Sequence, residues 1–153
     1  MSDEGEHAPR SVGATLRRVD DAWQGFRRAL ADFPVEHLDQ HIGEGWTRKQ
    51  MLAHIAAWHE LTVERLAAFA RSGEMQPLAI PEDDMNARVA RSAEGRTAGE
   101  VLAAADGSFR RVRQQIGYLS DEQLAAHDGW PAAVIAGNTY GHYAEHLRDL
   151  DWR

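Results

Sequence analysis

Two histidines near the end of the chain have the spacing that could hold one metal ion. His142 and His146 stand four residues apart in the segment TYGHYAEHLRDLDW. Residues four apart on an α-helix point to the same side, so one ring nitrogen of each could reach the same ion. The segment HLDQH places His37 and His41 at the same spacing. Because the chain contains eight histidines, spacing alone does not decide which pair carries chemistry.

The helix that carries His142 and His146 turns both side chains toward its apolar face. On ideal geometry His146 lies about 40° and Leu150 about 80° from the direction of His142. An inward imidazole needs partners for two ring nitrogens, because an unpaired buried polar group costs about 1–3 kcal/mol. A bound metal ion is one solution. Ordered water or hydrogen bonds in the core are the other, and the candidate side chains for such bonds are Thr139, Tyr140 and Tyr143.

The other pair, His37 and His41, lacks a long apolar helix. Both lie in a short connection between Pro34 and the run Gly43–Gly45. We therefore expect these two histidines to face solvent.

Two protein ligands make a weak metal site, so a third should come from a facing helix. The helix predicted to begin at Thr47 offers His54 and His59. Relative to its apolar side around Ile55, they deviate by about 100° and about 40° on ideal geometry. Periodicity mildly favours His59, but a helix in a bundle faces two neighbours. On the residues alone the choice stays open.

Amphipathic helices account for the elements that must position these residues. Apolar side chains recur every three or four positions in residues 11–33, 47–73 and 97–119, and a last helix follows the break at Gly129–Pro131. The connection of about 25 residues between the second and third long helices predicts a crossover with one short helix of its own. No convincing period-two run indicates a strand.

The fold predicted from this pattern is all-α, a four-helix bundle with a crossover connection. Both an up-down-up-down path and an up-down-down-up path are compatible with the spacing. Residues 1–12 are predicted to be a disordered polar tail, and residues 13–153 a single bundle domain.

Composition excludes several classes of function. The chain has no cysteine, so any thiol chemistry must use an exogenous thiol. Its formal charge is −7 and its arginines are scattered among acids, which argues against binding to nucleic acid. There is no apolar run of the ~18 residues that a membrane span requires, and no signal peptide, so a cytoplasmic location is expected.

In the segment GWTRKQMLAHIAAWHE a tryptophan, Trp46, precedes a histidine, His54, by eight residues. This pattern resembles that of the DinB-like (YfiT-type) superfamily of four-helix bundles. The segment NTYGHYAEHLRDL is similar to the closing HxxxH helix, and in detail it looks like the ClbS/DfsB branch. The resemblance covers nearly everything from Leu16 onward and implies a divalent metal, most often zinc or nickel. Carried over by position, it names as metal ligands His54, His142 and His146.

Other residues near the three histidines are weaker candidates. Those that could line a pocket are His59, Trp58, Asn86 and Tyr143, although a polar flank for His59, packing for Trp58 and Tyr143, and a surface or capping role for Asn86 are the more ordinary interpretations. Glu145 and Asp149 could accept a hydrogen bond from a ligand histidine. Their directions on the helix instead favour solvent-facing pairs with Arg148.

The function implied is metal-dependent chemistry on a small reactive molecule. Members of the superfamily include hydrolases and transferases that use a low-molecular-weight thiol, and the ClbS/DfsB branch is associated with protection against genotoxic metabolites. We therefore expect a hydrolase or thiol S-transferase that detoxifies a small electrophile. The alternative is a bundle that binds or sequesters such a molecule without turnover, and a third reading makes the histidines satisfied core groups. A homodimer is compatible with the sequence, although no surplus apolar face indicates one.

Overall fold

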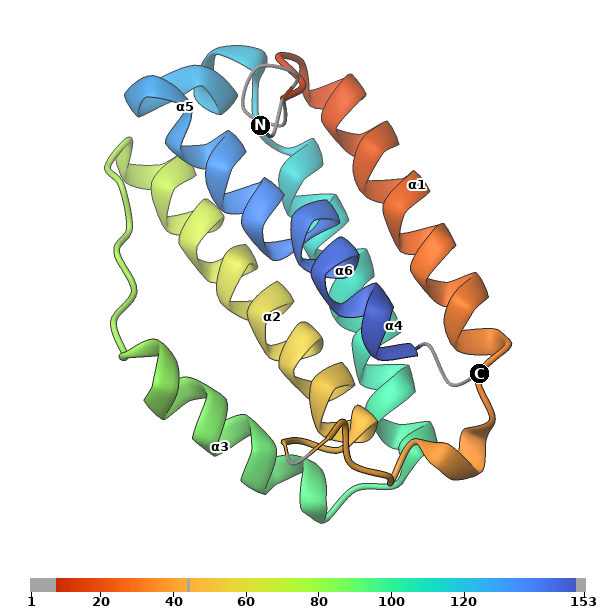
Figure 1. The fold of residues 1–153 in the computed structure, drawn as a ribbon. Helices are drawn as coiled ribbons and strands as arrows, with labels where there is room; N and C mark the ends of the chain where they lie inside the picture. Colours follow the sequence, from red (N-terminus) through yellow and green to blue (C-terminus); the bar gives the residue numbers. More distant parts are fainter. Residues whose placement is uncertain (1–7, 44, 151–153) are drawn as a thin grey trace.

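Four helical segments run along the molecule and form the bundle (Figure 1). They are α1 (Val12–Ala31), α2 (Arg48–Ser72), α4 (Ala98–Gly117) and the consecutive pair α5 (Asp121–Asn138) and α6 (Tyr140–Leu147). This computed structural model describes residues 8–43 and 45–150, and within those ranges there is no strand. The predicted all-α four-helix bundle is confirmed. Residues 1–7 of the predicted tail lie outside the described ranges, and Ser11 caps α1.

The crossover fixes the path of the chain. Figure 1 shows α2 and α4 running in the same direction, with α1 and α6 running the opposite way, so the path is up-down-down-up. The connection carries α3 (Glu82–Glu94), which lies outside the four long segments beside α2. Its buried residues are Val89 and Ala93. Two hydrogen bonds also join this segment to the start of α2, from Lys49 Nζ to the Arg96 carbonyl and from Gln50 Nε2 to the Ala90 carbonyl.

Local signals set most helix ends. Capping boxes begin three helices, with the N-cap hydroxyl and the third-residue side chain each bonded to the other's backbone N–H; the pairs are Thr47 with Gln50, Thr97 with Glu100, and Ser120 with Gln123. The predicted ends at Thr47, Thr97 and Gly73 are confirmed. Gly73 ends α2 in the left-handed region at φ 76°. None of the described helices combines the length and apolar composition of a membrane-spanning segment.

Replacing Gly73 with alanine should lower the free energy of unfolding by about 1 kcal/mol, because a side chain is disfavoured at a left-handed φ. No atom lies within 4 Å of an added Cβ at Gly73, so backbone strain is the whole expected effect. Gly95 is the matched control, since it also caps a helix in open space but at φ −88°. Urea unfolding should separate the two variants; equal losses would contradict the assignment to strain.

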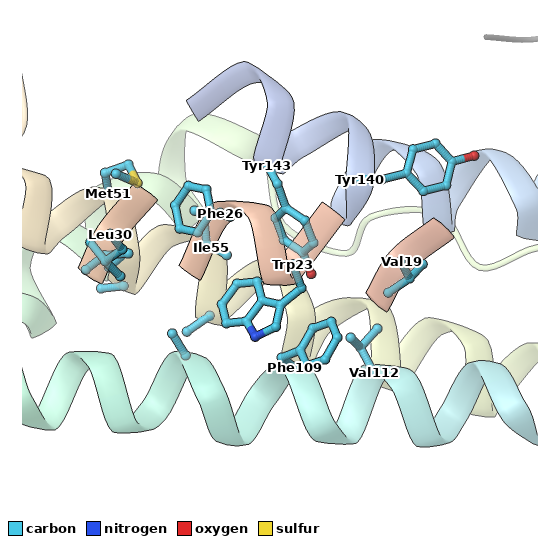
Figure 2. Close-up of a cluster of buried hydrophobic side chains, with 14 of the residues drawn as sticks. Val19, Trp23, Phe26, Leu30, Met51, Ile55, Phe109, Val112, Tyr140 and Tyr143 are labelled. Atoms are coloured by element: carbon cyan, nitrogen blue, oxygen red, sulfur yellow. The ribbon is translucent and has the colours of Figure 1, made fainter. Parts of the chain in front are cut away.

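Aromatic rings fill the core at the middle of the bundle (Figure 2). Trp23 stacks on Phe109 at a centroid distance of 4.8 Å, and its ring lies 5.1 Å from that of Tyr143. Figure 2 shows Tyr143 pointing from its helix into this group, close to Phe26 and Trp23. The core therefore joins α1, α4 and α6 at the level of His59 on α2, whose ring lies 5.6 Å from that of Trp23.

The break predicted at Gly129–Pro131 is present, because three consecutive residues, His127, Asp128 and Gly129, have positive φ and separate the first part of α5 from the rest. The segment that follows differs from the single helix predicted there. A second break falls at Thr139, where φ is −126° and ψ is −105°. The hydroxyl of Thr139 donates to the Ile135 carbonyl at 2.6 Å, a bond that competes with the helical ladder and favours bending. Helix α6 thus starts anew, without a side-chain cap, two residues before His142.

Candidate metal centre

Three histidines from two helices meet between α2 and α6. The Nε2 atom of His142 lies 2.8 Å from Nε2 of His54 and 3.1 Å from Nε2 of His146. All the potential ligand atoms lie within 4.8 Å of one another. His54 and His142 are buried and His146 is partly exposed. The structure therefore brings together the two histidines of the HxxxH segment and the one that the resemblance, rather than periodicity, selected on α2.

The second nitrogen of His54 has a partner on the crossover helix. Nδ1 of His54 lies 3.0 Å from Oδ1 of Asn86, and the indole Nε1 of Trp58 donates to the same oxygen at 3.1 Å. The indole nitrogen also lies 3.1 Å from Nδ1 of His54. The oxygen of Asn86 can only accept, so Nδ1 of His54 donates to it in the tautomer that carries the proton on Nδ1; in the other tautomer Nδ1 accepts from the Trp58 N–H. In the first tautomer the lone pair of His54 is on Nε2, facing the other histidines.

The second nitrogen of His146 is held by a carboxylate. Nδ1 of His146 lies 2.9 Å from Oδ2 of Asp149. The expectation that Asp149 faces solvent beside Arg148 is therefore wrong. The chain tightens into the 3₁₀ turn η2 (Arg148–Leu150), and this turn brings the side chain at i+3 back over His146. An acceptor on Nδ1 again directs the lone pair to Nε2, as carboxylates do for metal-binding histidines.

The third ring, His142, is less well satisfied. Its Nδ1 is buried and has no hydrogen-bond partner. Burial, followed by the nearby His54, His146 and His59, lowers the pKa of His142 to about 3. Burial, with His146 next in weight, also lowers the pKa of His54 to about 4, against a smaller opposing effect of the bond to Asn86. Both rings are therefore neutral at pH 7 and available as ligands.

These contacts fit a divalent cation. When Nδ1 of His54 donates to Asn86 and Nδ1 of His146 donates to Asp149, two Nε2 lone pairs point at the third imidazole, whose single N–H could satisfy only one of them well. A cation among the three Nε2 atoms would accept all three lone pairs, and neutral imidazole is a common ligand of zinc and nickel. The three histidines could therefore hold a metal ion. That they are its ligands remains a prediction.

The remaining residues predicted near the metal divide into two groups. Trp58 and Asn86 contact His54 directly. Asn86 therefore does not serve only in the surface or capping role that is more ordinary for such a residue. His59 and Tyr143 instead bond to each other in the core, where their exposed fractions are 0% and 1%. Tyr143 also borders a cavity of about 250 Å³ between α1 and α6, which none of the three clustered histidines lines.

The other pair at spacing four takes no part in this centre. His41 is exposed, as expected, and its Nδ1 lies 2.6 Å from the Gly45 carbonyl oxygen. His37 is half-buried against the ring of Phe33 in the 3₁₀ turn η1 (Val35–His37), so the expectation of full exposure is met only in part.

One residue near the histidines was not anticipated. Ser108 of α4 is 1% exposed, and its hydroxyl lies 2.8 Å from Nδ1 of His59. A small polar residue inside the apolar stripe of a helix was the available signal, since Ser108 stands three residues after Ala105 and four before Val112.

Comparison with known proteins adds a family to this geometry. No curated protein and no solved structure matches the chain. The family model of the DinB superfamily matches residues 18–149, which span α1 to η2 and include all three clustered histidines. The bundle, its crossover and this match together establish that the chain belongs to the DinB superfamily.

Proposed function

We propose that the chain is a metal-dependent enzyme of the ClbS/DfsB type, a hydrolase or thiol S-transferase that acts on a small electrophilic molecule in the cytoplasm. The observation that carries the proposal is the convergence of three Nε2 atoms, with Nδ1 of His54 and His146 each held by an acceptor. Such an arrangement has open coordination positions, as catalytic rather than closed structural sites have.

A divalent ion bound there would supply Lewis acidity, either to an electrophile or to an attacking nucleophile. The protein's own residues do the orienting. Asn86 and Asp149 orient the rings of His54 and His146, and of the three histidines only His146 is partly exposed. The chain has no cysteine, so an S-transfer reaction would take its thiol from a small cosubstrate.

Metal binding should be measurable as a gain in stability. Zinc or nickel at 100 times Kd should stabilise the folded chain by about 2.7 kcal/mol, provided the unfolded chain binds weakly. For a domain of this size that corresponds to a rise in Tm of roughly 5–10 °C. His142→Ala should abolish the rise, whereas His41→Ala, the same change at an exposed histidine, should leave it intact.

The protein for this experiment should be purified without a nickel column and its metal content measured. Absence of stoichiometric metal, together with wild-type zinc affinity in His142→Ala, would refute the metal site. Turnover is then tested with a panel of electrophiles, each with and without mycothiol, bacillithiol or glutathione. Rates that survive His54→Ala unchanged would exclude metal catalysis.

A specific feature favours sequestration as the second candidate. A cavity of about 460 Å³ runs along α5 and α6 and is lined in part by Ala132, Gly137 and Gly141. Its size suits a small ligand. It reaches the residue before His142, but none of the three clustered histidines lines it. Saturable binding of an electrophile without turnover, unaffected by His54→Ala, would support this candidate over the enzyme.

A further inference from the structure

A second histidine network lies in the core beside the metal centre. Nδ1 of His59 is 2.8 Å from the hydroxyl of Ser108, and its Nε2 is 2.5 Å from the hydroxyl of Tyr143. These residues come from α2, α4 and α6 and are all at most 1% exposed. The ring of Trp23 meets that of His59 edge-on at 5.6 Å. Nothing in the proposed chemistry uses this network.

Only one direction of the hydrogen bonds satisfies every atom of the network. The hydroxyl of Ser108 donates to the Ala105 carbonyl at 3.0 Å, so its oxygen accepts from Nδ1–H of His59. Nε2 of His59 is then an acceptor and receives the phenol proton of Tyr143. Burial raises the pKa of Tyr143 and lowers that of His59 to about 3, so the phenol is protonated and the imidazole neutral. The result is a continuous chain from α6 through α2 to α4.

This series of hydrogen bonds joins the same two helices, α2 and α6, that carry the three clustered histidines. Tyr143 stands between His142 and His146 on α6, and His59 follows His54 by five residues on α2. Helix α6 has eight residues and starts at the break at Thr139 without a side-chain cap. Its rotation about its own axis therefore depends on what its inward side chains touch. Tyr143 is the inward residue flanked by both histidines of α6.

We propose that His59 and Tyr143 are positioning residues that set the rotation of α6, so that His142 and His146 face His54 before a metal binds. This inference rests on the proposed metal site. A buried imidazole and phenol are costly to desolvate, and an apolar pair would fill the same volume more cheaply. A hydrogen bond requires a distance within a few tenths of an ångström, whereas apolar packing tolerates sliding, so the polar pair defines an orientation.

An effect on the orientation of the histidines is separated from an effect on stability by replacing His59 and Tyr143 together. In the double variant His59→Leu with Tyr143→Phe, no buried polar atom of the Tyr143–His59 bond is left unpaired, so the fold should keep near wild-type stability. We expect its Kd for zinc to rise 10–100-fold, as for the loss of groups that orient metal ligands. The absorption spectrum of bound Co²⁺ should also change, because the ligand geometry is altered. Tyr143→Phe alone, which removes one oxygen atom, should weaken zinc binding in the same direction.

Tyr140→Phe is the matched control, since it removes a hydroxyl from the same helix one turn earlier, outside the chain of hydrogen bonds to His59. Its zinc Kd and Co²⁺ spectrum should equal those of the wild type. Wild-type affinity and spectrum in Tyr143→Phe, or in a folded double variant, would overturn the inference while leaving the metal site intact. Failure of the wild-type protein itself to bind zinc, nickel or cobalt would instead refute the proposed function.

Discussion

Gly141→Ala should lower the free energy of unfolding by about 3 kcal/mol, the upper part of the range for overpacking. A Cβ added at Gly141 would lie 2.7 Å from the carbonyl oxygen of Ala136, closer than such atoms approach in proteins. The obstructing atom belongs to the backbone, so no side chain can rotate away. Because of the break at Thr139, the carbonyl of one helix faces the first turn of the next. The backbone itself must shift to admit the methyl group.

The shift should also weaken metal binding, because Gly141 immediately precedes His142. Gly137→Ala is the control: it lies one turn earlier, is exposed and has no atom within 4 Å of an added Cβ. In a helix this change should stabilise the protein by about 0.5–1 kcal/mol. Urea unfolding of the metal-free proteins and zinc titration provide the measurements. Equal stability of the two variants would show that the close approach at Gly141 is not a constraint.

Helix ends were predictable because their signals are local. Thr47 and Thr97 each carry a partner three residues later, and Gly73 supplies the left-handed exit. The breaks inside the last helix were not fully predictable. Gly129 and Pro131 indicated the first, but Thr139 is compatible with a continuous helix by composition. Its bend depends on where its hydroxyl goes once the side chain is buried.

Periodicity could not choose between His54 and His59 because α2 is buried on more than one side. Six consecutive residues, 51–56, are all buried, so this part of the helix has no single apolar direction from which to measure an angle. Both histidines point inward: His54 faces α6 and α3, whereas His59 faces α4 and α6. The resemblance to DinB-like proteins supplied what the helix geometry lacked.

The groups that orient the clustered histidines depend on tertiary structure. Asn86 reaches His54 only because the crossover lays α3 along α2, which no spacing within either segment predicts. Asp149 reaches His146 because the last turn is 3₁₀ rather than α. Ideal α-helical angles place Asp149 outward, but real helices depart most from ideal geometry at their ends. Asn86 and Asp149 were among the candidates named from the sequence, but which of them bonds which ring depends on the tertiary structure.

Acidification of the metal-free protein should unfold it steeply between pH 6.5 and pH 4. Burial, the largest cause in each case, lowers the pKa of His54 to about 4 and the pKa values of His59 and His142 to about 3. In the unfolded chain each has its ordinary pKa of 6.5. Below pH 6.5 the unfolded state therefore binds protons that the native state does not. The stability that these neutral rings contribute is fully present above pH 6.5 and is lost as the pH falls below it. The loss ends only when the rings also protonate in the native state.

The size of the effect follows from proton counting. Each histidine contributes about 1.4 kcal/mol per pH unit, so three contribute about 4 kcal/mol per unit near pH 5. The accumulated loss by pH 5 is about 6 kcal/mol, which is comparable with the whole stability of a typical domain. Urea unfolding at a series of pH values, in the presence of a chelator, measures the slope. His59→Leu should reduce the slope by about one third, because one of the three protons is removed. A wild-type slope below about 1 kcal/mol per unit between pH 6 and pH 5 would mean that these histidines are not buried as neutral rings.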